Sequence, residues 1–133
     1  MFLKKTLVTI SVLGSIVFIL TLFSEEFGLC SLTNQPCQET FDPIAEASVI
    51  FVPALIFSSI LYFGTKELFD LWAKVSFPFI VISLIAVFLA PEYSRDWMYP
   101  IEKGGIAFFM SSIFVVVSII IITFKYFSLK RGK

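Results

Sequence analysis

Both cysteines of the 133-residue chain lie in one short polar stretch, CSLTNQPC, with Cys30 and Cys37 at its ends. Pro36 and the polar residues between the two thiols let the chain turn back, so that a small disulfide-bonded loop can close. A catalytic redox pair more often has the spacing C-x-x-C at the start of a helix. The longer spacing here favours a structural disulfide, with a redox pair or two free thiols as the alternatives.

A second group of candidate residues lies in the segment PEYSRDWMYPIEKGG. Its charged and aromatic side chains suit contact with a partner protein or anchoring at lipid headgroups. The candidates for an interaction on this face are Glu92, Arg95, Asp96, Trp97 and Glu102. Acid–base chemistry in this segment would need its carboxylates to act together.

The chain contains no histidine. It therefore lacks the commonest general base and the commonest metal ligand. The sequence also has no glycine-rich phosphate loop, no G-x-S-x-G and no H-E-x-x-H. We expect no metal site, no cofactor and no enzymatic activity. The basic KRGK ending is explained more simply by membrane topology than by binding to nucleic acid, so no nucleic-acid partner is expected.

The composition indicates whether water or lipid surrounds the protein. Hydrophobic residues make up 58% of the sequence, charged residues only 15%, and the mean hydropathy is +0.95. Soluble domains have about 25% charged residues. A water-soluble fold of this size cannot bury so much apolar surface, which predicts that lipid surrounds much of it.

Apolar runs without charged residues predict four transmembrane helices, because a bilayer-spanning helix needs about 20 such residues. The predicted spans are 6–23, 47–65, 75–91 and 104–124, joined by outer loops 24–46 and 92–103 and an inner loop 66–74. The fold class is therefore all-α, a polytopic four-transmembrane-helix bundle with short loops and a single domain over 1–133.

Three local features refine this expectation. Pro53 and Pro78 fall inside the second and third spans and predict a bend in each helix. The inner connector, TKELFDLWAK, predicts a short interfacial helix that continues into the third span. The first span is expected to stay uncleaved, because TLFSEEFG has no small-residue cleavage site.

Basic residues predict the orientation, because lysine and arginine concentrate on the cytoplasmic side. One side receives Lys4, Lys5, Lys66, Lys74, Lys125, Lys130, Arg131 and Lys133, and the other side receives only Arg95 and Lys103. Tyr62, Trp72 and Tyr126 are expected near the inner lipid boundary. Both termini are thus predicted to be cytoplasmic in a multi-pass protein of the cell membrane. The cysteine loop is predicted to be extracytoplasmic, where disulfides persist.

Small residues recur at helical spacing in the first and fourth spans, where they let helix backbones approach closely in lipid. They are Ser11, Ser15, Gly104, Ala107, Ser111 and Ser118. We expect them to pack the four helices of this chain, with contact to a second copy or a partner as the alternative. No ionisable residue lies in the middle of a span, which disfavours a proton-coupled transporter.

These patterns favour a structural or accessory membrane protein that works by interaction. The expected partners are the lipid bilayer and either another membrane protein or further copies of the chain. The alternative is a small oligomeric channel or transporter for a lipophilic or small solute.

One part of the sequence resembles known proteins. Around FLAPEYSRDWMYPIEKG, followed by a long apolar run and FKYF, the chain resembles small uncharacterised four-span integral membrane proteins of bacteria. The resemblance covers the C-terminal half and implies the same four-span plan in the cell inner membrane. It implies no activity, ligand or catalytic residue.

We predict that a membrane-impermeant maleimide labels Cys30 and Cys37 in intact cells only after a reductant has opened their disulfide. The expected mass shift is two labels after reduction and none before it. Two labels without reductant would contradict the disulfide.

A reporter fused after Lys133 and found active only outside the cytoplasm would contradict the orientation.

Overall fold

The computed structural model describes residues 2–24, 26–28, 35–90 and 103–132. All regular secondary structure in these ranges is helical. The helices are α1 (Phe2–Leu22), α2 (Gln35–Ser48), α3 (Phe51–Tyr62), α4 (Lys66–Leu89) and α5 (Lys103–Arg131). Four helical segments are long and apolar enough to cross a membrane, and the second of them runs through α2 and α3 as Phe41–Tyr62. The predicted all-α four-helix bundle is therefore confirmed.

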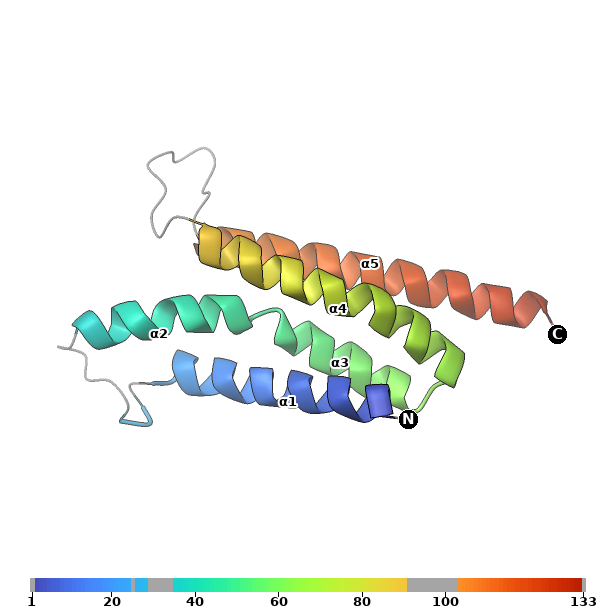
Figure 1. Cartoon of the computed structure of the whole chain (residues 1–133), viewed down its shortest axis with the longest axis horizontal. Coiled ribbons are helices and arrows are strands. Elements are labelled where there is room, and N and C mark those ends of the chain that lie inside the picture. Colours follow the sequence, from blue (N-terminus) through green and yellow to red (C-terminus); the bar gives the residue numbers. More distant parts are fainter. Residues whose placement is uncertain (1, 25, 29–34, 91–102, 133) are drawn as a thin grey trace.

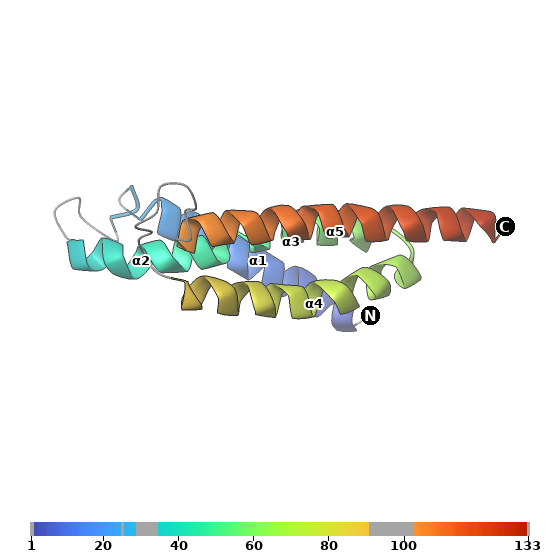
Figure 2. The same ribbon diagram turned by 90° about the horizontal axis from the view of Figure 1, so that it is seen from above.

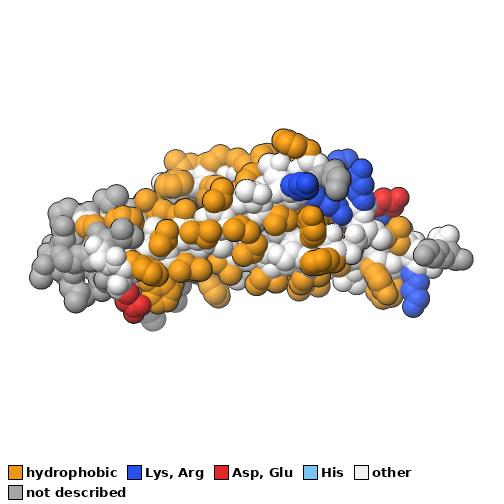
Figure 3. All heavy atoms as spheres, turned by 90° about the horizontal axis from the view of Figure 1, so that it is seen from below, with side chains coloured by type: hydrophobic (Ala, Val, Ile, Leu, Met, Phe, Trp, Pro, Cys, Tyr) orange, Lys and Arg blue, Asp and Glu red, His pale blue; other side chains and the backbone are white. Residues whose placement is uncertain are grey.

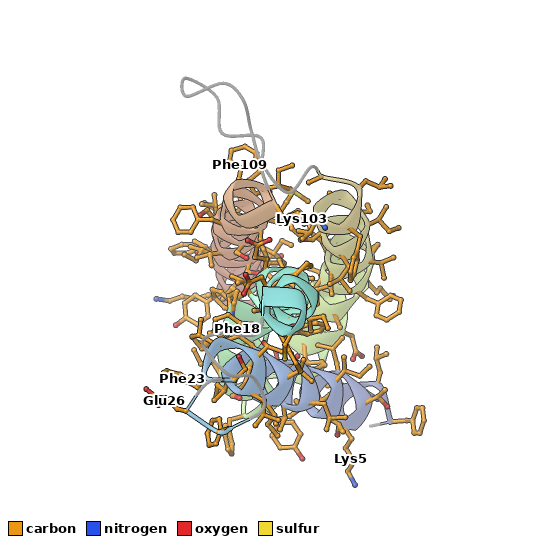
Figure 4. The ribbon with its side chains drawn as sticks, turned by 90° about the vertical axis from the view of Figure 1, so that its left-hand side faces the viewer. Lys5, Phe18, Phe23, Glu26, Lys103 and Phe109 are labelled. Atoms are coloured by element: carbon orange, nitrogen blue, oxygen red, sulfur yellow. The ribbon has the colours of Figure 1, made fainter. Side chains whose placement is uncertain are left out.

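The helices lie roughly along one axis (Figure 1). α1 packs along α2 and α3, and α4 packs along α5. Viewed from one end of the bundle, α2 lies between α1 and the pair formed by α4 and α5 (Figure 4). The N- and C-terminal ends lie at the same end of the molecule (Figure 1), and α5 extends there beyond the other helices (Figure 2).

The second membrane crossing is broken between α2 and α3, one turn before Pro53. Proline has no N–H, so the carbonyl of Val49 cannot receive the helical bond from position 53. The Val52 N–H donates to the Val49 carbonyl instead, at 3.2 Å, and the chain tightens there. Pro78 has a milder effect, since α4 continues through it as one curved helix (Figure 2).

One segment predicted as a loop forms a helix that the sequence did not predict, and a second contains the helix that was expected there. Residues 35–46, expected in an outer loop, form most of α2. Their acidic residues interrupt the apolar run, so hydropathy did not reveal this helix, which is held by packing against α1, α4 and α5. The predicted inner loop 66–74 is the first part of α4, so the helix expected in this connector is present and continues into the third span.

Large apolar side chains cover the outside of the bundle, and the interior combines apolar side chains with many small or hydroxyl-bearing residues. Leu89 is 81% exposed and Phe108 is 73% exposed, and hydrophobic atoms cover most of the face in Figure 3. The buried hydroxyl residues are Ser11, Ser15, Thr21, Ser24, Ser48, Ser58, Ser76, Ser83, Ser111 and Ser118. This distribution is the one expected when lipid surrounds the helices and small residues let them approach.

A close contact between α1 and α3 shows how tightly the helices pack beside the break. The hydroxyl of Ser15 donates to the backbone carbonyl of Phe51 at 3.2 Å. Next to it, a Cβ atom added to Gly14 would overlap the ring of Phe51. Glycine at position 14 therefore makes room for the first side chain of α3.

We predict that Gly14→Ala destabilises the bundle by about 1–3 kcal/mol, because the added methyl group meets the Phe51 ring. Helix propensity alone would give the opposite sign, since alanine is better than glycine inside a helix by about 1 kcal/mol. The free energy of unfolding in detergent micelles measures the change, and Phe51→Leu in the same chain should recover part of the loss.

The matched control is Gly132→Ala near the end of α5, where an added Cβ would find its nearest atom at an ordinary 3.7 Å. This variant should leave the unfolding free energy nearly unchanged. Stabilisation by Gly14→Ala would contradict the packing between α1 and α3.

Candidate functional site

Aromatic rings fill the centre of the bundle where α3, α4 and α5 meet. Phe114 of α5 is 1% exposed. Its ring centroid lies 5.6 Å from that of Phe79, 6.2 Å from that of Trp72 and 6.4 Å from that of Phe57. Offset and edge-to-face pairs at these distances stabilise a core beyond simple burial. We call Phe57, Trp72, Phe79 and Phe114 the aromatic core.

Trp72 links the aromatic core to a serine of α5. Its indole Nε1–H donates to the hydroxyl oxygen of Ser118 at 3.0 Å, and both side chains are at most 1% exposed. The sequence predicts Trp72 near the inner lipid boundary, and its depth in the membrane stays a prediction. The structure shows that its side chain faces the interior of the bundle. Trp72 shares the buried side of α4 with Leu68, Ala73 and Ser76, and a buried indole N–H needs an acceptor, which Ser118 provides.

The small residues predicted to pack helices lie mostly inside the bundle. Five of them are buried, namely Ser11, Ser15, Ala107, Ser111 and Ser118. Gly104 is half-buried at the start of α5, where a Cβ atom would come within 3.1 Å of Oε1 of Glu46 from α2. Among the residues that the structure describes, the Ser111 hydroxyl is the buried side-chain polar group without a hydrogen-bond partner.

The interaction candidates of the outer segment lie outside the described residues. This holds for Glu92, Arg95, Asp96, Trp97 and Glu102, and for Cys30. Cys37 is described and lies half-buried near the start of α2. The disulfide and the outer interaction face therefore remain predictions.

Reactive groups are sparse in the part of the chain that the structure describes. It brings no three His, Cys, Asp or Glu side chains together in a way that could hold a metal ion. Some buried hydroxyls bond to their own helices, as Thr21 does to the Val17 carbonyl at 2.8 Å and Ser48 to the Ile44 carbonyl at 2.6 Å. Such bonds satisfy polar groups in an apolar interior.

The structure adds a site that the sequence did not reveal. A hollow of about 360 Å³ opens at the end of the bundle that holds both termini. It is lined by Lys4 and Lys5 of α1, Tyr62 of α3 and Lys66 of α4. We call this site the basic hollow. About 60 positions of sequence separate Lys66 from the other two lysines. From the sequence, these lysines predicted only the membrane orientation, because no pattern predicted that the start of α1 meets the turn between α3 and α4.

Two neighbouring contacts define the surroundings of the basic hollow. The Nζ atom of Lys4 lies 5.1 Å from the ring centroid of Phe69, a cation–π distance. The carboxylate of Glu67 lies 3.9 Å from Nζ of Lys125 on α5. A second hollow of about 430 Å³ lies between the start of α4 and the end of α5, and its described lining includes a single charged residue, Lys130.

The chain matches no protein-family model, no curated protein and no solved structure. The resemblance to four-span bacterial membrane proteins therefore remains a prediction from the sequence.

We predict that Ser118→Ala destabilises the bundle by about 1–3 kcal/mol, because it leaves the buried indole N–H of Trp72 without an acceptor. A double-mutant cycle with Trp72→Phe should give a coupling energy of about 0.5–1.5 kcal/mol. Denaturant titration in detergent micelles measures each free energy of unfolding.

Ser112→Ala is the matched control, because Ser112 is an exposed serine of the same helix, α5, and its hydroxyl bonds to the Phe108 carbonyl within that helix. Its effect should stay within about 0.5 kcal/mol. An equal cost for Ser112→Ala and Ser118→Ala would contradict the role of the bond between α4 and α5.

Proposed function

We propose that this chain is an integral membrane protein with a structural or accessory role, which acts through contact with another membrane protein. The observation that carries the proposal is the aromatic core. Phe114 and its three ring neighbours occupy the middle of the bundle at centroid distances of 5.6–6.4 Å. Ring packing at the centre of one copy supports a role as a scaffold over a role as a channel.

The polar groups of the interior support the same proposal. The hydroxyls of Ser15 and Ser118 join neighbouring helices, and those of Thr21, Ser48 and Ser58 bond within their own helices. A catalytic serine needs a base within hydrogen-bond reach to activate it. These hydroxyls have partners suited to packing, so the role we propose is non-catalytic.

The orientation and the disulfide belong to the proposal. Both termini lie at one end of the bundle (Figure 1), which agrees with an even number of crossings, and the excess of lysine and arginine places that end in the cytoplasm. The opposite side then carries Cys30 and Cys37 as a structural bridge. It also carries eight acidic residues against two basic ones, a charge pattern that suits meeting another protein.

Extraction in a mild detergent, followed by native mass spectrometry, tests the proposal. The expected result is a complex in which the chain has a foreign protein at fixed stoichiometry. The purified chain alone, reconstituted in liposomes, should give no solute or ion flux above that of empty liposomes. A silent chain that never acquires a partner, even after cross-linking in native membranes, would contradict an accessory role.

The channel alternative makes a distinct prediction in the same liposomes. If solute crossed the bundle, a homo-oligomer of the Phe114→Leu variant would give a different flux from the wild-type homo-oligomer, because Phe114 lies in the centre of the bundle. Phe109→Leu is the control, because Phe109 is 63% exposed and points away from the bundle (Figure 4). Flux that responds to Phe114→Leu and not to Phe109→Leu would overturn our proposal in favour of a channel.

A further inference from the structure

We propose that the basic hollow binds an anionic phosphate group, of the kind carried by an anionic phospholipid headgroup or by free phosphate. This inference does not depend on the accessory role proposed above. It rests on the shape of the hollow, on the charges that line it and on its place at the boundary of the apolar surface.

Three helices build the hollow at one end of the bundle. The first turns of α1 supply Lys4 and Lys5, the last residue of α3 is Tyr62, and the first residue of α4 is Lys66. Because α1 packs along α3, these residues meet although the sequence separates them. A volume of about 360 Å³ falls within the range of small-ligand sites, about 300–1,000 Å³.

The described lining carries three ammonium groups and one phenol, with no carboxylate among them. Like charges held together are unfavourable until an anion neutralises them. Two acidic residues follow Lys66 in α4, and neither is among the described lining of the hollow. Glu67 approaches Nζ of Lys125 at 3.9 Å, and Asp70 lies half-buried one turn further along α4. A phosphate accepts several charge-assisted hydrogen bonds and matches this set of donors.

The start of α4 adds to the positive potential. Thr65 precedes Lys66 with an extended backbone, and its side chain makes no capping hydrogen bond to the first turn. The N–H groups at a helix N-terminus carry a partial positive charge and favour an anion nearby. An anion beside Lys66 would therefore interact with its ammonium group and with the positive end of α4.

The surroundings place the hollow where a phospholipid presents its phosphate. Phe2 is 85% exposed and Phe63 is 89% exposed, so apolar surface lies beside the lysines. Basic side chains gather near this end of the molecule, and hydrophobic side chains cover most of the remaining face in Figure 3. Lys5 extends outward from α1 (Figure 4), a position from which its ammonium group reaches the headgroup layer.

Native mass spectrometry in mild detergent tests the site with three probes: phosphatidylglycerol, phosphatidylcholine and inorganic phosphate. The pocket variant carries Lys4→Gln, Lys5→Gln and Lys66→Gln. Its control carries Lys74→Gln, Lys130→Gln and Arg131→Gln, which remove equal charge from the same end without touching the described lining of the hollow. We expect phosphatidylglycerol to bind the wild-type protein in preference to phosphatidylcholine.

The pocket variant should lose about tenfold in affinity for phosphatidylglycerol, and the control should stay within about twofold. The milder pair Lys5→Gln and Lys66→Gln, both at exposed positions, repeats the test if the triple variant unfolds. Tyr62→Phe should weaken binding without changing charge.

Equal losses in the pocket variant and its control would overturn the proposal, because the attraction would then belong to the whole basic end. Unchanged binding in the pocket variant would overturn it as well. Inorganic phosphate that binds alone, and loses affinity in the pocket variant only, would support the phosphate site and assign it to the free ion. Binding of the lipid without the free ion would assign it to a headgroup.

Discussion

Polar groups inside a lipid bilayer must find their hydrogen-bond partners within the protein, and the architecture of this chain follows from that constraint. Helices satisfy the backbone along each crossing. Side-chain hydroxyls then bond to carbonyls of their own helix, as Ser58 does to Leu55 at 3.1 Å. The Trp72 indole meets the same requirement across the bundle, since Ser118 of α5 accepts its N–H at 3.0 Å. Hydroxyl residues that would favour the surface of a soluble protein therefore line the interior here.

The break between α2 and α3 depends on the same constraint. Pro53 removes one helical donor, and the Val52 N–H, which donates to Val49, replaces it within a tightened turn. α1 supports this region, where the Ser15 hydroxyl reaches the Phe51 carbonyl and Gly14 leaves room for the Phe51 ring. The irregular backbone is thus held between α1 and the rest of the bundle, away from lipid, which is where membrane proteins tolerate such breaks.

The two ends of the molecule differ in their physical character. Between the two ends, the rings of the aromatic core pack against one another. The end that holds both termini gathers lysines and has two hollows, of about 360 and 430 Å³. Among the described lining residues, the smaller hollow has three lysines and the larger has one. The packed core is the basis of the accessory role that we propose, and the smaller hollow is the basis of the proposed phosphate site.

The sequence by itself determined the class of the protein and its helical crossings. Apolar runs free of charge are a local property, so they predicted four helices. The bend near Pro53 followed from the proline itself, and the helical connector that begins at Lys66 followed from the pattern of TKELFDLWAK. The sequence missed the helix over residues 35–46, because its acidic residues hid an element stabilised by packing on three other helices. Tertiary structure alone decided that Trp72 is buried and that Lys4, Lys5 and Lys66 meet in one hollow. The side of a helix that faces protein or lipid depends on its neighbours, and hydropathy hardly distinguishes the two sides when both are apolar.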